Sequence, residues 1–345
     1  MSLPPSEIPQ GAIRFNTDSQ KLEFYAQDQW WEMVTDTPNL GRGADTGPGA
    51  RGVFAGGLNP GLSPSHQNVI QYITISSTGN AQDFGDLING SRYGNSACSS
   101  STRGIWSGGI NSPTFFNDID YVTISSTGDA QDFGNLLGAV FYSASVSNST
   151  RGVCGGGSTP SIQNILQYVT IASTGNAVDF GDLTTYHTSF GSCASPTRGI
   201  FAGGNTPTTV NTIQYITIST LGDAVDFGDL TLTRHYLAGC SNATRGVFGG
   251  GYIAPGTPGN TPRIDYIQIS TLGNAVNFGN LTVSRREIGA VSSSTRGVFA
   301  GAWVPLTNTI DYVTINTQGD AVDFGDLTID TLVQEAGCSN AHGGL

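Results

Sequence analysis

The sequence predicts an all-β protein, a six-bladed propeller with four-stranded blades and a small N-terminal β segment. Three observations predict it. First, a segment of the form Arg-Gly-x-x-x-Gly recurs six times, with spacings of 52, 48, 47, 47 and 51 residues, starting at Arg51, Arg103, Arg151, Arg198, Arg245 and Arg296. Second, apolar residues alternate with period two and nowhere keep a period of 3.6. Third, four short strands in every 47 to 52 residues are typical of propeller blades.

Each copy contains the same four candidate strands, which we call a, b, c and d. In the fifth copy they are residues 238–243, 246–250, 264–270 and 275–281. Strand c alternates around a tyrosine, and a Gly-Asn or Gly-Asp turn joins it to strand d, which carries Phe-Gly-x-Leu. Glycines at the end of strand b let neighbouring blades approach closely, because a side chain there would collide.

The two ends of the repeated region predict how the ring closes. Residues 41–50 have almost no strand character where the first copy should have strand a. Residues 336–341 form a good strand a with no blade after them. We therefore expect the C-terminal strand to pair with residues 52–57 and complete the first blade, which removes the exposed edges.

The N-terminal residues differ from the repeats. Three short strands are predicted at residues 12–16, 21–25 and 30–34. A segment of about 30 residues cannot bury enough surface to fold alone. We expect residues 1–37 to serve as an anchor or oligomerisation segment, and the Gly/Pro-rich residues 38–50 to link it to the propeller at residues 51–345. The aromatic residues that would make its contacts are Phe15, Phe24, Tyr25, Trp30 and Trp31.

Two resemblances add to this interpretation. Val-Phe-Gly-Gly at residues 247–250, together with Leu-Thr-x-x-Arg at Leu230–Arg234 and Leu281–Arg285, resembles the kelch repeat, although phenylalanine replaces the usual tryptophan of the fourth strand. It implies a kelch-like propeller, most of which are interaction modules. Residues 11–18, with Leu22, Tyr25 and Trp30, resemble a short motif of bacteriophage tail-fibre and related virion proteins. That resemblance implies attachment to a virus particle.

Composition excludes several classes of partner. The chain has 26 acidic and 14 basic residues and a net charge of −12, which argues against nucleic acid or an anionic membrane as the main partner. No run approaches the roughly 18 apolar residues of a membrane span. The N-terminus has no basic and apolar stretch typical of a secretory signal. We expect synthesis in a host cytoplasm and localisation in the virion, with no membrane insertion.

Several motifs that suggest chemistry have simpler explanations. Asp-Phe-Gly occurs five times without the other kinase motifs, so it is interpreted as structural. Strand a carries cysteine in four copies and Val146 or Val291 in two, which indicates a small buried apolar group. His66, His187, His235 and His342 share no repeat position, so neither a metal nor another cofactor is expected. The six recurrent arginines form either an anion site or, as their recurrence favours, ion pairs with Asp and caps on carbonyls.

Function is expected on the face where the b–c and d–a connections emerge, which we call the loop face. Ten aromatic residues outside the scaffold all fall in these connections. Aromatic rings among polar groups suit sugar rings or a protein surface. The alternative is that some of them, such as Tyr93 and Phe190, begin strand a and point into the core. The candidate binding face comprises Tyr93, Phe115, Phe116, Tyr142, Tyr186, His187, His235, Tyr236, Tyr252 and Trp303.

The first functional hypothesis is a non-enzymatic virion protein, a tail-fibre or other appendage component that binds another protein or a host-surface glycan. Its N-terminal segment would contact other virion proteins and form a homo-oligomer, with a trimer among the options. The second is a polysaccharide hydrolase, which needs a pair of carboxylates; Glu287 and Glu335 are the non-repeated glutamates of the ring. The third is a cellular kelch-like adaptor, which would not explain the N-terminal motif. No catalytic residue is assigned.

Overall fold

The computed structural model describes residues 11–16, 21–26, 29–32, 50–88, 90–253, 259–329 and 336–345. All regular elements in these ranges are β-strands. Within them there is no helix of the length and apolarity that would span a bilayer. The chain divides into two compact units, Met1–Arg42 and Gly43–Leu345.

The first unit contains the predicted three-stranded antiparallel meander: β1 (Ile13–Asn16), β2 (Lys21–Ala26) and β3 (Gln29–Glu32). In it, the Arg14 guanidinium lies 4.1 Å from the Trp30 ring and bonds Glu23 at 2.7 Å, while Tyr25 packs edge-on against Trp30. The side chains of Phe15, Phe24 and Trp31 lie outside the described residues. Attachment and oligomerisation through this segment therefore stay predictions.

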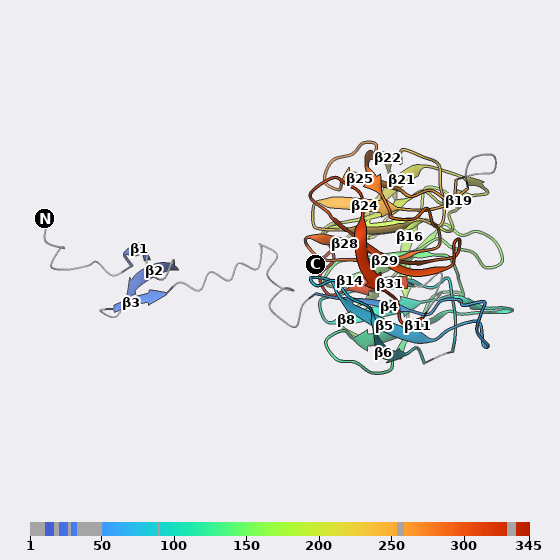
Figure 1. Ribbon diagram of the computed structural model, residues 1–345, viewed down its shortest axis with the longest axis horizontal. Helices are drawn as coiled ribbons and strands as arrows, with labels where there is room; N and C mark the ends of the chain where they lie inside the picture. The colour runs from blue at the N-terminus through green and yellow to red at the C-terminus, as the bar shows by residue number, and fades with distance from the viewer. Residues whose placement is uncertain are drawn as a thin grey trace, which may run out of the picture. The chain divides into compact units, whose positions relative to one another are not determined.

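The second unit is the predicted six-bladed propeller (Figure 1). Each blade is a four-stranded antiparallel sheet in the order a, b, c, d. Blade 1 contains β31 (Ala336–Ser339), β4 (Arg51–Ala55), β5 (Val69–Thr74) and β6 (Gln82–Asp86); blade 2 contains β7 (Ser96–Ser99), β8 (Arg103–Ser107), β11 (Asp118–Thr123) and β12 (Gln131–Asn135); blade 3 contains β13 (Ala144–Ser147), β14 (Arg151–Gly155), β15 (Ile165–Thr170) and β16 (Val178–Asp182). Blade 4 contains β17 (Gly191–Ala194), β18 (Arg198–Ala202), β21 (Thr212–Thr217) and β22 (Val225–Asp229); blade 5 contains β23 (Ala238–Ser241), β24 (Arg245–Gly249), β25 (Arg263–Gln268) and β26 (Val276–Asn280); blade 6 contains β27 (Gly289–Ser292), β28 (Arg296–Ala302), β29 (Thr307–Thr314) and β30 (Val322–Asp326).

Ring closure by the C-terminal strand is confirmed. Strand β31 pairs antiparallel with β4, in a register that sets Ala336 opposite Ala55 and Ser339 opposite Gly52. Strand a of each blade contacts strand a of its neighbours, so these six strands surround a central channel. Two small hairpins, β9 (Ile110–Asn111) with β10 (Thr114–Phe115) and β19 (Asn205–Thr206) with β20 (Thr208–Thr209), extend b–c connections. In Figure 1 the β19 hairpin projects from the loop face; we call the opposite face, on the side where the C-terminus lies, the turn face.

The outer edge of each blade is covered by the c–d turn of the next blade. At the first junction the Gly128 amide donates to the Phe84 carbonyl at 2.7 Å, and the Ala130 amide donates to the Asp86 carbonyl at 2.8 Å. The Asp129 carboxylate accepts from the Asp86 amide at 3.0 Å. All six junctions repeat these bonds. The Asp-Phe-Gly and Gly-Asn/Asp motifs thus protect strand edges, as their structural interpretation required.

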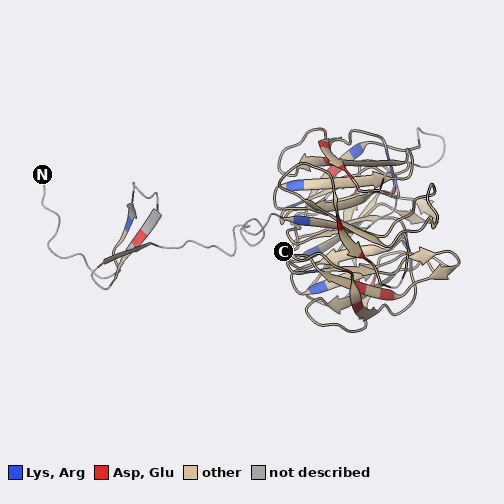
Figure 2. Cartoon of the chain, turned by 60° about the horizontal axis from the view of Figure 1, so that its bottom comes forward, with Lys and Arg blue, Asp and Glu red and all other residues tan. Residues whose placement is uncertain are grey.

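The recurrent Arg-Gly pair joins the blades at the turn face. Each arginine stacks on the tyrosine of its own strand c at 4.4 to 4.7 Å and donates to an isoleucine carbonyl of the next blade, as Arg51 does to Ile124 at 3.1 Å. Figure 2 shows blue segments gathered at the side of the ring where the C-terminus lies. Carbonyl capping is confirmed. Ion pairing with Asp is wrong, because the six arginines make none within the described residues.

The glycine after each of these arginines makes room for strand a of the preceding blade. Cys338 Sγ would lie 2.9 Å from a Cβ on Gly104, and Val291 fills the same space over Gly52. Burial raises the pKa of Cys240 and Cys338 to about 12, so these thiols stay protonated. All five cysteines are free. The prediction of a small buried apolar group at this position of strand a is confirmed.

Candidate functional site: the channel mouth on the loop face

The residue two positions before strand a recurs in a left-handed conformation. Gly94, Tyr142, Ser189, Tyr236 and Glu287 have φ values of 65°, 54°, 59°, 58° and 58°. In four of them the amide donates to the carbonyl of the equivalent residue in the preceding blade, as Tyr142 does to Gly94 at 2.7 Å and Glu287 to Tyr236 at 2.9 Å. These inter-blade bonds form an arc around the channel on the loop face. We call the five residues the mouth arc.

The mouth arc retains large side chains at a conformational cost. A residue with a Cβ in the left-handed region is disfavoured by about 1–2 kcal/mol, whereas glycine is not. Gly94 shows that glycine fits this repeat position, yet two copies carry tyrosine and one carries glutamate. Strained residues that persist in this way cluster at binding and catalytic sites. The side chains of Tyr142, Tyr236 and Glu287 are therefore the first candidates for function.

A cavity opens between these side chains. Its volume is about 420 Å³, including space open to solvent. Its walls are formed by the mouth arc and by the residue that follows each of its members: Gly94, Asn95, Tyr142, Ser143, Ser189, Phe190, Tyr236, Leu237, Glu287 and Ile288. Below it the channel continues between the small residues of the a strands, among them Ala97, Ser145 and Gly239. The mouth is the wide, chemically varied end of a narrow channel.

Aromatic contacts extend from the mouth over the loop face. The Tyr142 and Tyr236 rings meet edge to face, with centroids 5.3 Å apart. From Tyr142 contacts continue to Phe141 at 4.7 Å, and from there to Phe115 at 5.4 Å. Tyr93 lies 6.3 Å from Tyr142. These rings join blades 2, 3 and 5 across the mouth.

A second branch starts at Tyr236. His235 lies 4.7 Å from Tyr236 and 5.4 Å from Tyr252, and the Arg286 guanidinium covers the Tyr252 ring at 4.6 Å. Six of the ten predicted face residues thus belong to one connected cluster: Tyr93, Phe115, Tyr142, His235, Tyr236 and Tyr252.

Four predicted residues lie outside that cluster, and three of them are at least partly exposed. Phe116 is half-buried, 5.7 Å from the Arg92 guanidinium. Tyr186 is 60% exposed. Trp303 is half-buried, and its backbone amide donates to the Arg286 carbonyl at 3.1 Å. A binding role for these three rests on their exposure alone.

The prediction for His187 is wrong, because its side chain is buried and only 1% exposed. It occupies the repeat position that Arg92, Arg234 and Arg285 occupy in other blades, and its Nδ1 faces the Gln214 amide at 3.4 Å. Burial lowers the pKa of this imidazole. Phe190 is also buried, 5.7 Å from Phe201, so the alternative of core packing holds for that residue.

Three arginines of the d–a connections are likewise interior. Arg92, Arg234 and Arg285 are 0% exposed and pair with Asp120, Asp265 and Asp311 at 2.7, 2.9 and 2.9 Å. An alignment of the six copies would have indicated this pairing of Arg with Asp, because strand c carries Asp in these three blades and Gln71, Gln167 or Gln214 in the others. The arginine of Leu-Thr-x-x-Arg and the Asp of the following strand c form one buried unit.

The mouth is acidic in character. Glu287 is 8% exposed and forms an ion pair with Arg286, whose Nε lies 3.7 Å from Oε1. Burial and the Glu287 charge raise the pKa of both Tyr93 and Tyr236. Burial and Arg286 lower the pKa of His235 to about 4. At neutral pH the tyrosines are therefore protonated and His235 is uncharged.

Asn95 is the mouth residue that sequence reasoning missed. It is 7% exposed, and its Oδ1 has no hydrogen-bond partner. The other described copies have Ser143, Phe190, Leu237 and Ile288 at this position. Aligning the copies would have singled it out as an amide at a mainly apolar position.

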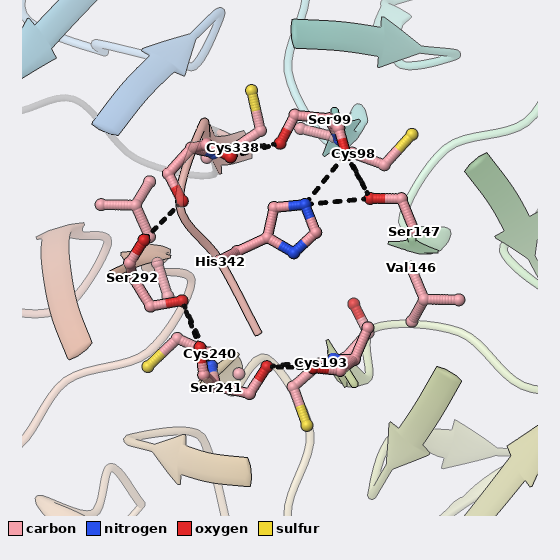
Figure 3. A pocket seen from close by; sticks show the side chains of 18 of the residues that line it. Cys98, Ser99, Val146, Ser147, Cys193, Cys240, Ser241, Ser292, Cys338 and His342 are labelled. Carbon is pink, nitrogen blue, oxygen red and sulfur yellow. Dashed lines mark hydrogen bonds between the residues drawn. The ribbon is translucent and has the colours of Figure 1, made fainter. Parts of the chain in front are cut away.

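The opposite end of the channel is filled by the chain itself (Figure 3). Hydroxyls of strand a donate to carbonyls of the preceding blade, as Ser99 does to Ser339 at 2.7 Å and Ser147 to Ser99 at 2.8 Å. The His342 ring projects into the middle of this ring of serines, its Nε2 2.9 Å from the Ser99 carbonyl, and its Nδ1 accepts from the Gly344 amide at 3.0 Å. This end is occupied by structural bonds.

No group of three or more His, Cys, Asp or Glu side chains suited to a metal ion occurs in the described ranges. Glu335, the second carboxylate of the hydrolase hypothesis, lies outside them. Comparison of the chain with known protein families and with curated proteins finds no match in either. The geometry of the mouth and the N-terminal motif are therefore the basis for assigning a function.

Proposed function

We propose that this protein is a non-enzymatic recognition protein whose propeller binds a surface glycan at the channel mouth on the loop face. The observation that carries the proposal is the mouth arc, which holds Tyr142, Tyr236 and Glu287 in a conformation that glycine would adopt more cheaply. A fold that needed only the inter-blade bonds would be better served by glycine at each position.

The chemistry of the mouth favours a carbohydrate. Tyrosine rings provide apolar faces for the C–H surface of a sugar, and their hydroxyls provide polar tips. Asn95 and Glu287 add acceptors for sugar hydroxyls. A protein ligand would reach the same cluster through a protruding loop.

The N-terminal resemblance gives the biological setting. We propose that the protein is a bacteriophage virion component, part of a tail fibre or related appendage, with the meander as its attachment and oligomerisation segment. On the propeller, the tyrosines of the mouth and the Arg286–Tyr252 pair are residue types that are enriched where proteins bind their partners. In this arrangement the propeller is the part that contacts the host.

The test of recognition uses glycine, the residue that blade 2 already carries. The Tyr142→Gly/Tyr236→Gly variant removes both rings and relieves the backbone strain, so we expect a melting temperature within a few degrees of the parent. Binding of the labelled protein to host cells and to a host-polysaccharide array should fall at least tenfold. Leu137→Ala, which removes a 56% exposed apolar side chain elsewhere on the loop face and outside the candidate binding residues, is the control and should bind normally. Unchanged binding by the double variant contradicts the proposal.

The virion assignment has its own test. Mass spectrometry and immunogold labelling of purified particles should find the protein at the tail or another appendage. Its absence from particles contradicts that part of the proposal. Release of reducing sugar ends from host polysaccharide by the purified protein would contradict the non-enzymatic assignment.

A further inference from the structure

The side chains at the mouth do not follow the sixfold symmetry of the scaffold, because tyrosines lie on one side and hydrogen-bond acceptors on the other. Its two tyrosines come from blades 3 and 5, whereas its strongest acceptors, Glu287 and Asn95, come from blades 6 and 2. Glu287 and Asn95 lie on either side of blade 1, and the Glu287 charge acts on Tyr93, which lies two residues before Asn95. The acceptors thus form one wall of the cavity and the aromatic rings the other.

Cations are scarce around this acceptor wall. Among the described residues that line the cavity there is no Lys, Arg or His. Arg286 lies outside the lining, stacked on Tyr252, and meets Glu287 at an ion-pair distance of 3.7 Å. Arg92 is fully buried and bonded to Asp120. His235 is neutral above about pH 4. A carboxylate that is 8% exposed therefore faces a cavity whose lining supplies no positive charge.

We propose that the ligand enters the mouth with a protonated primary amine, as carried by a de-N-acetylated amino sugar; this rests on the proposed function. An ammonium group has three donors and no acceptor, which matches a wall of acceptors. It also interacts favourably with the faces of tyrosine rings. The ammonium pairs with Glu287, the sugar ring lies against Tyr142 and Tyr236, and the Asn95 Oδ1 accepts from a neighbouring hydroxyl.

Three other occupants fit less well. A divalent metal such as calcium takes six to eight oxygen ligands, whereas the described lining offers one carboxylate. A neutral N-acetylated sugar would bring no positive charge to the side of the cavity where Glu287 lies. A uronic acid would add a second negative charge.

The experiment compares two oligosaccharides of equal length that differ in N-acetylation and therefore in charge. Binding of the full-length protein to chitosan tetrasaccharide and to its fully N-acetylated counterpart is measured by calorimetry at pH 6, where the amines are protonated. We expect the amine form to bind at least tenfold more tightly. The Glu287→Gln variant keeps the shape of the side chain and should reduce this ratio to about one. Adding calcium or a chelator should change neither affinity.

Several results would overturn the inference: equal or tighter binding of the N-acetylated form, a preference that survives in Glu287→Gln, calcium-dependent binding, or no binding of either probe. Each is distinguishable from failure of the proposed function. If the Tyr142→Gly/Tyr236→Gly variant still loses binding to host cells, the mouth remains the recognition site and only the ligand class is wrong.

Discussion

The buried pair Arg234–Asp265 offers a sharp test of how the blades are held together. Arg234 donates to Asp265 at 2.9 Å and to the carbonyls of Gly250 and Arg263 at 2.7 and 2.6 Å. Asp265 also accepts from the Thr231 hydroxyl at 2.6 Å. Both charged side chains are 0% exposed. Burial lowers the pKa of Arg234 to about 10, which leaves it charged at neutral pH.

Blade 3 supplies the matched replacement. It carries Val140 and Gln167 at the two positions, and Gln167 accepts from the Leu137 amide at 2.7 Å much as Asp265 accepts from Thr231. Arg234→Val leaves the buried Asp265 carboxylate without its ion-pair partner, and Asp265→Gln does the same to the buried Arg234 guanidinium. Each single change should cost about 3–5 kcal/mol of unfolding free energy. The double variant leaves no uncompensated charge and should cost about 1–3 kcal/mol less than the milder single variant.

The measurement is urea unfolding followed by fluorescence and circular dichroism for the parent, both single variants and the double variant. These costs imply a coupling free energy of at least about 4 kcal/mol in the double-mutant cycle. The companion cycle at Arg285 and Asp311 in blade 6, where the distance is also 2.9 Å, should give a similar value. Additive single effects in both blades would refute the view that the arginine and aspartate act as one unit.

Three further predictions follow. Deletion of residues 336–345 removes the strand that completes blade 1, and should abolish the cooperative thermal transition seen by calorimetry. Gly279→Ala sets a methyl group against the Gly319 carbonyl and should cost about 1–3 kcal/mol in urea unfolding, whereas Gly138→Ala, which meets nothing within 4 Å, should be nearly neutral. Burial lowers the pKa of His187 and His342, so the folded state binds fewer protons than the unfolded state. Stability should therefore fall as pH drops from about 6.5 towards 5, less steeply in His342→Gln.

The fold was predictable from the sequence because its interactions are repeated. Six copies of one pattern reveal which residues the scaffold needs, and the lone strand at 336–341 reveals how the ring closes. What the repeat did not reveal was the partner of each recurrent group. The recurrent arginines donate to backbone carbonyls of the next blade. Every residue has a backbone carbonyl, so the sequence does not indicate which one accepts. Ion pairing with aspartate was therefore a natural expectation and a wrong one.

The site was predictable only to the level of a face. Connectivity alone places the d–a connections on the loop face, but the direction of each side chain depends on the local backbone. His187 and Ser189 are two residues apart, yet His187 is buried against Gln214 whereas Ser189 lines the mouth. The deciding features are the repeat position and the sign of φ. Repeat position is legible in the sequence, as the pairing of Arg with Asp in three blades shows, but the left-handed conformation of Tyr142 and Tyr236 is not.

The scaffold itself limits where this protein can vary. In every blade the turn-face arginine contacts the next blade, and the glycine beside it and the glycine of the c–d turn contact the preceding blade, so a change at any of them disturbs a junction. The recurrent inter-blade bonds of the mouth arc run through its backbone, so its side chains can differ from blade to blade. These side chains do differ, since the five residues are Gly94, Tyr142, Ser189, Tyr236 and Glu287. Every one except the glycine adopts its positive φ at a cost in conformational free energy. Because a ring with equivalent backbone bonds presents a different side chain from each blade, the mouth acquires two chemically distinct walls without any change in fold.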